Sequence, residues 1–114
     1  NIQASDFYSA LSHPMRLRAV VLIIQMNDFV FVNLPQLGQA QPVISRHLSQ
    51  LKETKILLAR KQGQWVYYRI NDALPKWALD VIRATLNGVL DLPPYQNDRQ
   101  ALYPMSNRPN QACC

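Results

Sequence analysis

The chain has 114 residues and a formal net charge of +5, and its 48% content of hydrophobic residues suffices for one core but not two. The longest apolar run, residues 19–24, is too short to span a membrane, and residues 1–10 lack the basic start and apolar run of a signal peptide, so a cytoplasmic protein without membrane contact is expected. The two cysteines cannot form a disulfide framework. With only three glycines the sequence offers no glycine loop for a phosphate, and it has no nucleophile–base pair, so an enzyme is not expected.

Two helices are predicted at the N-terminal end. Residues 5–11 have Ser5 as a candidate cap, and residues 12–14 end this helix. Residues 15–26 follow as a second helix with a buried stripe of Leu17, Val20, Val21 and Ile24. His13, a lone histidine before a proline, is interpreted as a structural or capping residue rather than a ligand.

The next segments predict a helix-turn-helix. Residues 28–32 are rich in strand-favouring side chains, and residues 33–37 form a short helix that ends at Gly38. A further helix starts at Pro42, where a first turn loses nothing by lacking an N–H group. This second helix would enter the major groove of DNA.

Residues 41–70 combine that helix with a hairpin. Its apolar residues, Ile44, Leu48 and Leu51, share one face, and the opposite face is polar. Residues 56–58 and 65–70 then favour strands, with a turn at residues 61–64 between them. A polar-faced helix followed by a basic hairpin is typical of a winged helix-turn-helix fold, which is mainly α with a β-hairpin wing.

The charge of this segment predicts operator double-stranded DNA as the partner. Residues 41–70 hold six cations and one acid, so their net charge equals that of the whole chain. Such a basic footprint attracts phosphates. The candidate DNA-binding residues, with donors or acceptors for base edges or phosphates, are Gln41, Ser45, Arg46, His47, Ser49 and Gln50 in the helix and Arg60, Lys61, Gln62 and Gln64 in the hairpin. For His47, phosphate contact and packing are equally open, and packing is favoured over base stacking for Trp65 and the hairpin tyrosines.

The longest predicted helix covers residues 72–90, with Asp72 as its cap. Its apolar face is wider than packing on a hairpin needs, so part of it is expected to meet its copy in a homodimer. The predicted interface, formed by the terminal helices, comprises Phe7, Leu11, Trp77, Val81, Leu86 and Val89. One domain is therefore expected over residues 1–91, with a flexible tail rich in Pro, Asn and Gln over residues 92–114.

Three stretches in order resemble the ArsR/SmtB family: ALSHPMRLR from Ala10, QPVISRHL from Gln41 and QGQWVYYR from Gln62. The resemblance covers roughly residues 7–90 and is strongest to the arsenic-responsive branch. It implies a dimeric winged-helix repressor of a metal or metalloid resistance operon that binds its operator without ligand and leaves it when an inducer binds.

One departure from the family concerns the inducer site. The arsenic-responsive branch usually carries Glu-Leu-Cys-Val-Cys-Asp-Leu before the recognition helix, but residues 28–34 here read DFVFVNL, with valines at both thiol positions. The zinc-type site that other members place on the last helix is also not expected, because both histidines, His13 and His47, lie outside residues 72–90.

The remaining thiols are Cys113 and Cys114, and adjacent cysteines form only a strained disulfide. Two neighbouring thiolates can hold a thiophilic centre. Trivalent arsenic or antimony, or an organoarsenical such as methylarsenite that needs only two sulfurs, is the hypothesised inducer, and no cofactor is expected for folding. A redox or electrophile sensor, a tail with incidental cysteines and a winged-helix module that binds an acidic protein remain alternatives.

Overall fold

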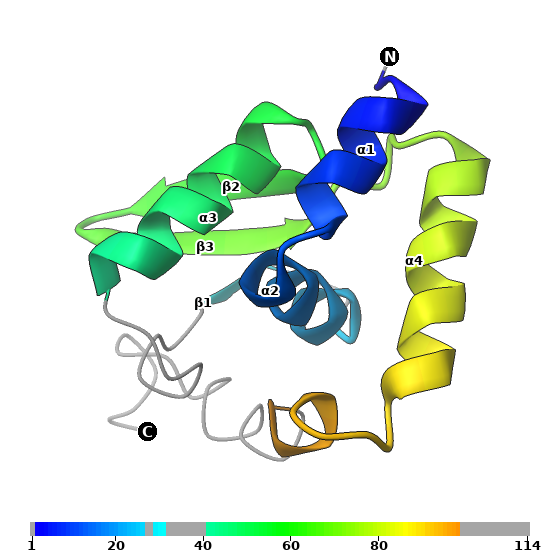
Figure 1. Ribbon diagram of the computed structural model, residues 1–114. Helices are drawn as coiled ribbons and strands as arrows, with labels where there is room; N and C mark the ends of the chain where they lie inside the picture. The colour runs from blue at the N-terminus through cyan, green and yellow to red at the C-terminus, as the bar shows by residue number, and fades with distance from the viewer. Residues whose placement is uncertain (1, 27–28, 32–40, 99–114) are drawn as a thin grey trace.

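The computed structural model describes residues 2–26, 29–31 and 41–98. It contains the helices and strands, in order, α1 (Ala4–Leu11), α2 (Pro14–Ile24), β1 (Val30–Phe31), α3 (Gln41–Glu53), β2 (Leu57–Gln62), β3 (Trp65–Ile70) and α4 (Lys76–Val89) (Figure 1). The mainly helical chain with a β-hairpin was predicted correctly. The short helix predicted at residues 33–37 and the terminal cysteine pair lie outside the described residues.

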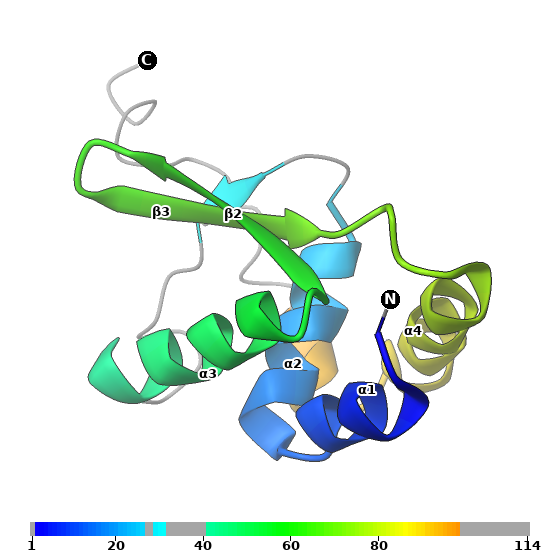
Figure 2. The same cartoon turned by 90° about the horizontal axis from the view of Figure 1, so that it is seen from above.

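Helix α2 is the element on which the others pack. It contacts α1, α3, α4 and β3, and these elements surround it in two perpendicular views (Figures 1 and 2). The predicted apolar stripe was therefore too narrow: Leu22 and Ile23 are buried although they were not assigned to it, whereas Leu17 and Ile24 stay partly exposed. A helix covered on several sides buries more than one stripe.

The start of α2 is set by a histidine and a proline. The ring Nδ1 of His13 accepts a hydrogen bond from the backbone N–H of Met15 at 3.1 Å, and Pro14 occupies the first helical turn. The predicted capping role of His13 is confirmed. The predicted caps of two other helices were wrong. Helix α1 begins after Gln3 without a side-chain cap, so Ser5 lies inside it, and α4 begins after Pro75 rather than at Asp72.

Helix α3 buries the predicted stripe and ends in a defined turn. Ile44, Leu48 and Leu51 are all buried. At the end of the helix, the backbone N–H of Ile56 donates to the carbonyl of Leu51, and that of Lys55 donates to the carbonyl of Lys52, both at 3.0 Å. Lys55 has a φ of 71°, so this is a Schellman motif with a lysine at the left-handed position. The motif turns the chain directly into β2.

The three strands form one antiparallel sheet in the order β1-β3-β2. Gln62 pairs with Trp65, so the hairpin turn is shorter than the predicted segment 61–64. Successive side chains of β3 point to opposite faces of the sheet, and Tyr67 on one face and Ile70 on the other are both buried. The sheet thus has buried positions on both faces, and burial of Tyr67 agrees with packing rather than base stacking.

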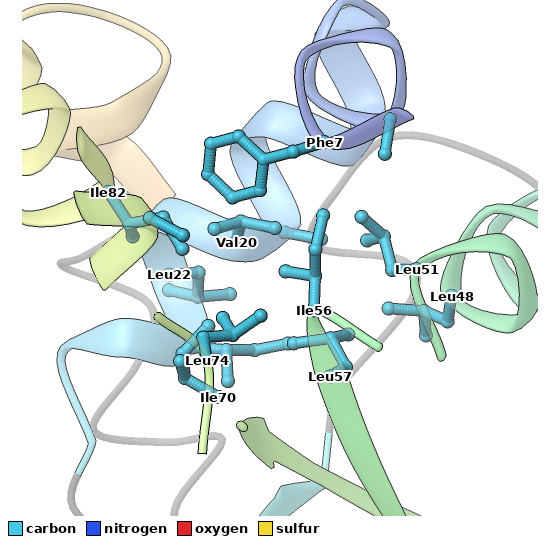
Figure 3. Close-up of a cluster of buried hydrophobic side chains, with 14 of the residues drawn as sticks. Phe7, Val20, Leu22, Leu48, Leu51, Ile56, Leu57, Ile70, Leu74 and Ile82 are labelled. Atoms are coloured by element: carbon cyan, nitrogen blue, oxygen red, sulfur yellow. The ribbon is translucent and has the colours of Figure 1, made fainter. Parts of the chain in front are cut away.

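Six elements contribute to a single core. Figure 3 shows side chains from all six in one buried cluster around Ile56: Phe7 of α1, Val20 and Leu22 of α2, Leu48 and Leu51 of α3, Leu57 of β2, Ile70 of β3 and Ile82 of α4. Within the described residues, no helix combines the length and the apolar character that crossing a bilayer requires.

Beyond α4, residues 95–98 form a helical turn that returns to α2 (Figure 1). Arg18 donates from Nε to Oδ2 of Asp98 at 3.0 Å and from a terminal nitrogen to Oδ1 at 2.7 Å, and Asp98 is only 4% exposed. The domain boundary predicted at residue 91 is therefore corrected for this segment, because residues up to Asp98 pack on the body.

Replacement by alanine is expected to change the stability of the protein in opposite directions at Gly63 and Gly88. Gly63 has a φ of 62°, a conformation that costs an L-residue about 1 kcal/mol, whereas Gly88 lies inside α4, where an added methyl group would meet no atom within 4 Å. We expect Gly63→Ala to lower the free energy of unfolding by about 1 kcal/mol and Gly88→Ala to raise it by about 0.5–1 kcal/mol. Urea titrations of both variants test this, and effects of equal sign would contradict it.

Candidate nucleic-acid interface

The outward face of α3 presents polar and cationic side chains. Ser45, Arg46, Ser49 and Gln50 are exposed, on the side of the helix away from its buried stripe. This arrangement follows from the 3.6-residue period, which separates the apolar and polar positions of the sequence onto opposite faces. The side chain of Gln41, also a candidate, lies outside what the structure describes.

Two of the predicted contact residues on α3 already have partners within the protein. A terminal nitrogen of Arg16 lies 2.6 Å from Oε1 of Gln50 and 3.3 Å from Nδ1 of His47. The ring of His47 also packs against the ring of His13, with 4.2 Å between the centroids. Of the two possibilities left open for His47, the contacts favour packing over phosphate binding.

The His47 contacts require a neutral ring. Arginine is a donor only, so Nδ1 of His47 accepts and carries no proton. Burial lowers the pKa of His47, and the positive charges of nearby His13, Arg16 and Arg46 lower it further. Protonation would place a donor on Nδ1 and break the contact with Arg16.

This histidine predicts a pH dependence of stability. Because its pKa is lower in the folded than in the unfolded protein, the unfolded state binds more protons below about pH 6.5, and stability falls as the pH decreases through that range. We expect the urea midpoint to be constant from pH 8 to pH 7 and to decrease from pH 6.5 to pH 5. The variant His47→Gln should show a shallower decrease, and an equally steep one would assign the effect to other groups.

The hairpin carries the second part of the basic surface. Lys61, Gln62 and Gln64 at its end are exposed, as predicted for contacts to DNA. Arg60 was predicted at the tip, but it pairs with Tyr67 in the middle of the hairpin and its guanidinium lies 4.6 Å from the ring centroid of Phe29. The position of Arg60 is therefore corrected from the tip to the middle of the hairpin, where its side chain is exposed, and its contact with DNA stays a prediction.

A second exposed surface lies where α1 meets α4. Tyr8 is 51% and Trp77 39% exposed, and their rings are 6.4 Å apart in a stacked arrangement. Phe7 supports Trp77 edge-on but is 0% exposed, so its predicted place at a dimer interface is corrected: it is a core residue of the protomer. The other predicted interface residues that are partly exposed are Leu11, Val81, Leu86 and Val89.

The described part of the chain offers no metal site: in residues 2–26, 29–31 and 41–98, no three His, Cys, Asp or Glu side chains come together. The one carboxylate of α4, Asp80, accepts a hydrogen bond from Lys76 at 2.8 Å. Nothing in this helix matches the ligand set of a zinc-type site.

Comparison with known proteins decides the family. No family model matches the chain. The arsenic resistance transcriptional regulator ArsR2 of Pseudomonas putida is 43% identical over 86 residues, which is 75% of each chain, and the arsenical resistance operon repressor of Escherichia coli is 41% identical over 78 residues, 68% of this chain and 67% of that protein. The chain belongs to the ArsR/SmtB family. It is a winged-helix transcriptional repressor of this family, not an enzyme.

Solved structures agree with the fold. HlyU of Vibrio cholerae matches with a TM-score of 0.59 at 20% identity, covering 79% of this chain and 90% of that one. The transcriptional repressor BigR of Xylella fastidiosa matches with a TM-score of 0.57 at 24% identity, covering 75% and 84%. The predicted winged-helix fold is therefore confirmed.

Proposed function

We propose that this ArsR/SmtB repressor controls an arsenic resistance operon by binding its operator as a homodimer and dissociating when trivalent arsenic binds. The observation that carries the proposal is the exposed Ser45–Arg46–Ser49 face of α3 beside a basic wing, in a chain 43% identical to an arsenic resistance regulator. Helix α3 packs against strand β2 of the wing, so both elements would contact phosphates and base edges of the same DNA.

Within this proposal, α3 and the wing have different tasks. Arg46 can contact a guanine edge with two hydrogen bonds, and Ser45 and Ser49 can reach bases or phosphates. Lys61, Gln62 and Gln64 would contact phosphates or the minor groove and would therefore bind many sequences similarly. The exposed pair Tyr8 and Trp77 would join the two protomers, so that two α3 helices face two half-sites.

The proposed inducer site is the thiol pair Cys113 and Cys114. Thiolates are the protein ligands with the strongest preference for soft centres, and these are the only cysteines in the chain. A mono-organic arsenical needs two sulfurs, so one chain can bind it. Inorganic trivalent arsenic favours three, so a thiol of a second protomer would complete its coordination.

The test is fluorescence anisotropy of a duplex from the protein's own upstream region, titrated first with protein and then with arsenite or methylarsenite. Wild-type protein should bind at nanomolar to submicromolar concentration and be released by an arsenical. The Cys113→Ser, Cys114→Ser variant should bind equally well and resist release. Sedimentation of wild-type protein on the same duplex gives the number of protomers bound.

Other outcomes point to the alternatives. Release by an oxidant but by no arsenical would identify a redox sensor, which the thiol pair can also form by linking subunits through disulfides. Equal affinity for the operator and a scrambled duplex would remove sequence-specific repression and favour a partner with an acidic surface. Release that persists in the double cysteine variant would place the inducer site elsewhere in the chain.

A further inference from the structure

The side chain of Arg16 joins three helices at the edge of the DNA-binding surface. It projects from α2, donates from Nε to the carbonyl of Ala10 at 2.7 Å and reaches the carbonyl of Ser9 at 3.4 Å, both in the last turn of α1. The other end of the same guanidinium contacts His47 and Gln50 on α3. Helices α1 and α3 both pack against α2 (Figures 1 and 2).

The α1 contacts fix the guanidinium in place. The last carbonyls of a helix lack intrahelical partners and carry partial negative charge, so a cation that hydrogen-bonds to them is held by both effects. The planar guanidinium then has a single orientation in which its remaining N–H groups face α3. The arginine is therefore oriented by α1 before any DNA is present.

This orientation decides which end of the Gln50 amide faces outward. A guanidinium nitrogen is a donor only, so the group 2.6 Å from it must be the amide oxygen rather than the NH₂ group. The NH₂ group is then the end of the amide that Arg16 does not hold, and Gln50 is an exposed residue of α3. The amide oxygen has two lone pairs, so Arg16 fixes the orientation of the amide and leaves the NH₂ group as its free donor.

We infer that Arg16 is a positioning residue for operator binding, which fixes the Gln50 amide so that its NH₂ group can donate to an acceptor of the DNA, and which couples α3 to α1. The acceptor is a phosphate oxygen or a purine or thymine acceptor at a base edge, since both accept from an NH₂ group. The inference rests on the proposed operator binding, and it adds a residue outside the recognition helix and wing to the binding machinery.

The test is a double-mutant cycle on operator affinity with Arg16→Ala, Gln50→Ala and the double variant. Each single variant should bind roughly tenfold more weakly, because a charge-assisted hydrogen bond or a donor to DNA is lost. The double variant should be no more than about twofold weaker than the weaker single one, because both changes remove the same contact. Losses that multiply would show that Arg16 and Gln50 act independently and would overturn the inference.

Two further variants separate positioning from structural support. Gln50→Glu keeps an acceptor for Arg16 but has no NH₂ group, so it should fold normally and still bind DNA weakly; wild-type affinity would overturn the inference even if Arg16→Ala does not fold. Ser12→Ala removes a 2.7 Å hydrogen bond to the carbonyl of Ser9, so it disturbs the same end of α1 without touching α3, and it should keep wild-type affinity. Equal loss in Ser12→Ala would make Arg16 merely a support of α1.

The measurement also separates this inference from the proposed function. If wild-type protein does not bind its upstream duplex, operator binding itself has failed. If wild-type protein binds but arsenicals do not release it, the inducer is wrong and the cycle still tests Arg16. A scrambled duplex identifies the acceptor: equal losses on both duplexes indicate a phosphate, and a loss confined to the operator indicates a base edge.

Discussion

Replacing Arg18 by methionine is expected to lower the free energy of unfolding by about 3 kcal/mol, the largest stability effect of any single change predicted for this chain. The reason lies in its partner. Asp98 is 4% exposed and receives two hydrogen bonds from the guanidinium, so the substitution leaves a buried carboxylate without a counter-charge. The hydrogen bond to Asp98 is also what chiefly raises the pKa of Arg18, so the guanidinium stays charged across the physiological range.

The two members of this pair should not be equivalent. Arg18 is 19% exposed, so in Asp98→Asn its charge can still be solvated, and a loss of about 1–2 kcal/mol is expected. The double variant Arg18→Met, Asp98→Leu should recover most of the stability, because it also removes the buried carboxylate that Arg18→Met leaves without a counter-charge. Urea unfolding at pH 7 measures all three variants. A double variant as unstable as Arg18→Met would show that the geometry of the pair, rather than its charge, supports the segment.

Hydrogen exchange can test which segment the Arg18–Asp98 pair stabilises. The pair connects positions 80 residues apart and holds the helical turn at residues 95–98 against α2. In Arg18→Met, amides of that turn should lose protection more than amides of α2, because a short segment at the surface opens without unfolding the core. Uniform loss of protection would indicate that the segment is part of the cooperative core.

The recognition helix and the wing could be predicted from sequence because their signals are local. The apolar spacing of Ile44, Leu48 and Leu51 defines a helix face, and Gly63 within strand-favouring residues defines a hairpin, without knowledge of any distant residue. The length of the turn could not be predicted in this way, because the register that pairs Gln62 with Trp65 depends on pairing along the whole hairpin.

Arg16 and Arg18 show what local patterns cannot provide. Neither belongs to the predicted apolar stripe of residues 15–26, and that pattern says nothing about their partners. The partners of Arg16 on α3 are 31 and 34 positions away, and Asp98 is 80 positions from Arg18. Such pairs are brought together by helix packing, which a periodicity of 3.6 residues does not encode.

The start of the last helix was predicted wrongly for a related reason. Asp72 has the chemistry of a cap, but its carboxylate lies 3.6 Å from Arg69, and the neighbouring Asn71 accepts from the N–H of Ala73 and donates to the carbonyl of Lys55. These contacts form a turn before α4, so the helix starts later, after Pro75. Residues that favour caps also favour turns, and tertiary contacts decide between the two.

Replacing Arg46 by alanine is expected to produce the largest loss of operator affinity among the exposed residues of α3. Arg46 is exposed on the polar face of the helix, where a guanidinium can contact two acceptors of one guanine, and such a contact contributes about 1–3 kcal/mol to discrimination, or roughly 5- to 150-fold in affinity. Anisotropy titrations should show this loss with the operator and a smaller one with a scrambled duplex. Arg46→Lys should recover little, because an ammonium group cannot form the paired contact.

Lys61→Ala provides the matched control on the wing, and the comparison separates reading of sequence from attraction to phosphate. Lys61 is exposed near the end of the hairpin, so its removal should weaken binding to both duplexes by the same factor and reduce the slope of log affinity against log salt by about 0.9. Arg46→Ala should change the ratio of operator to scrambled affinity, whereas Lys61→Ala should leave that ratio intact. If the ratio is unchanged in Arg46→Ala, Arg46 binds phosphate, and sequence reading by α3 must come from Ser45, Ser49 or the NH₂ group of Gln50, whose amide oxygen Arg16 holds.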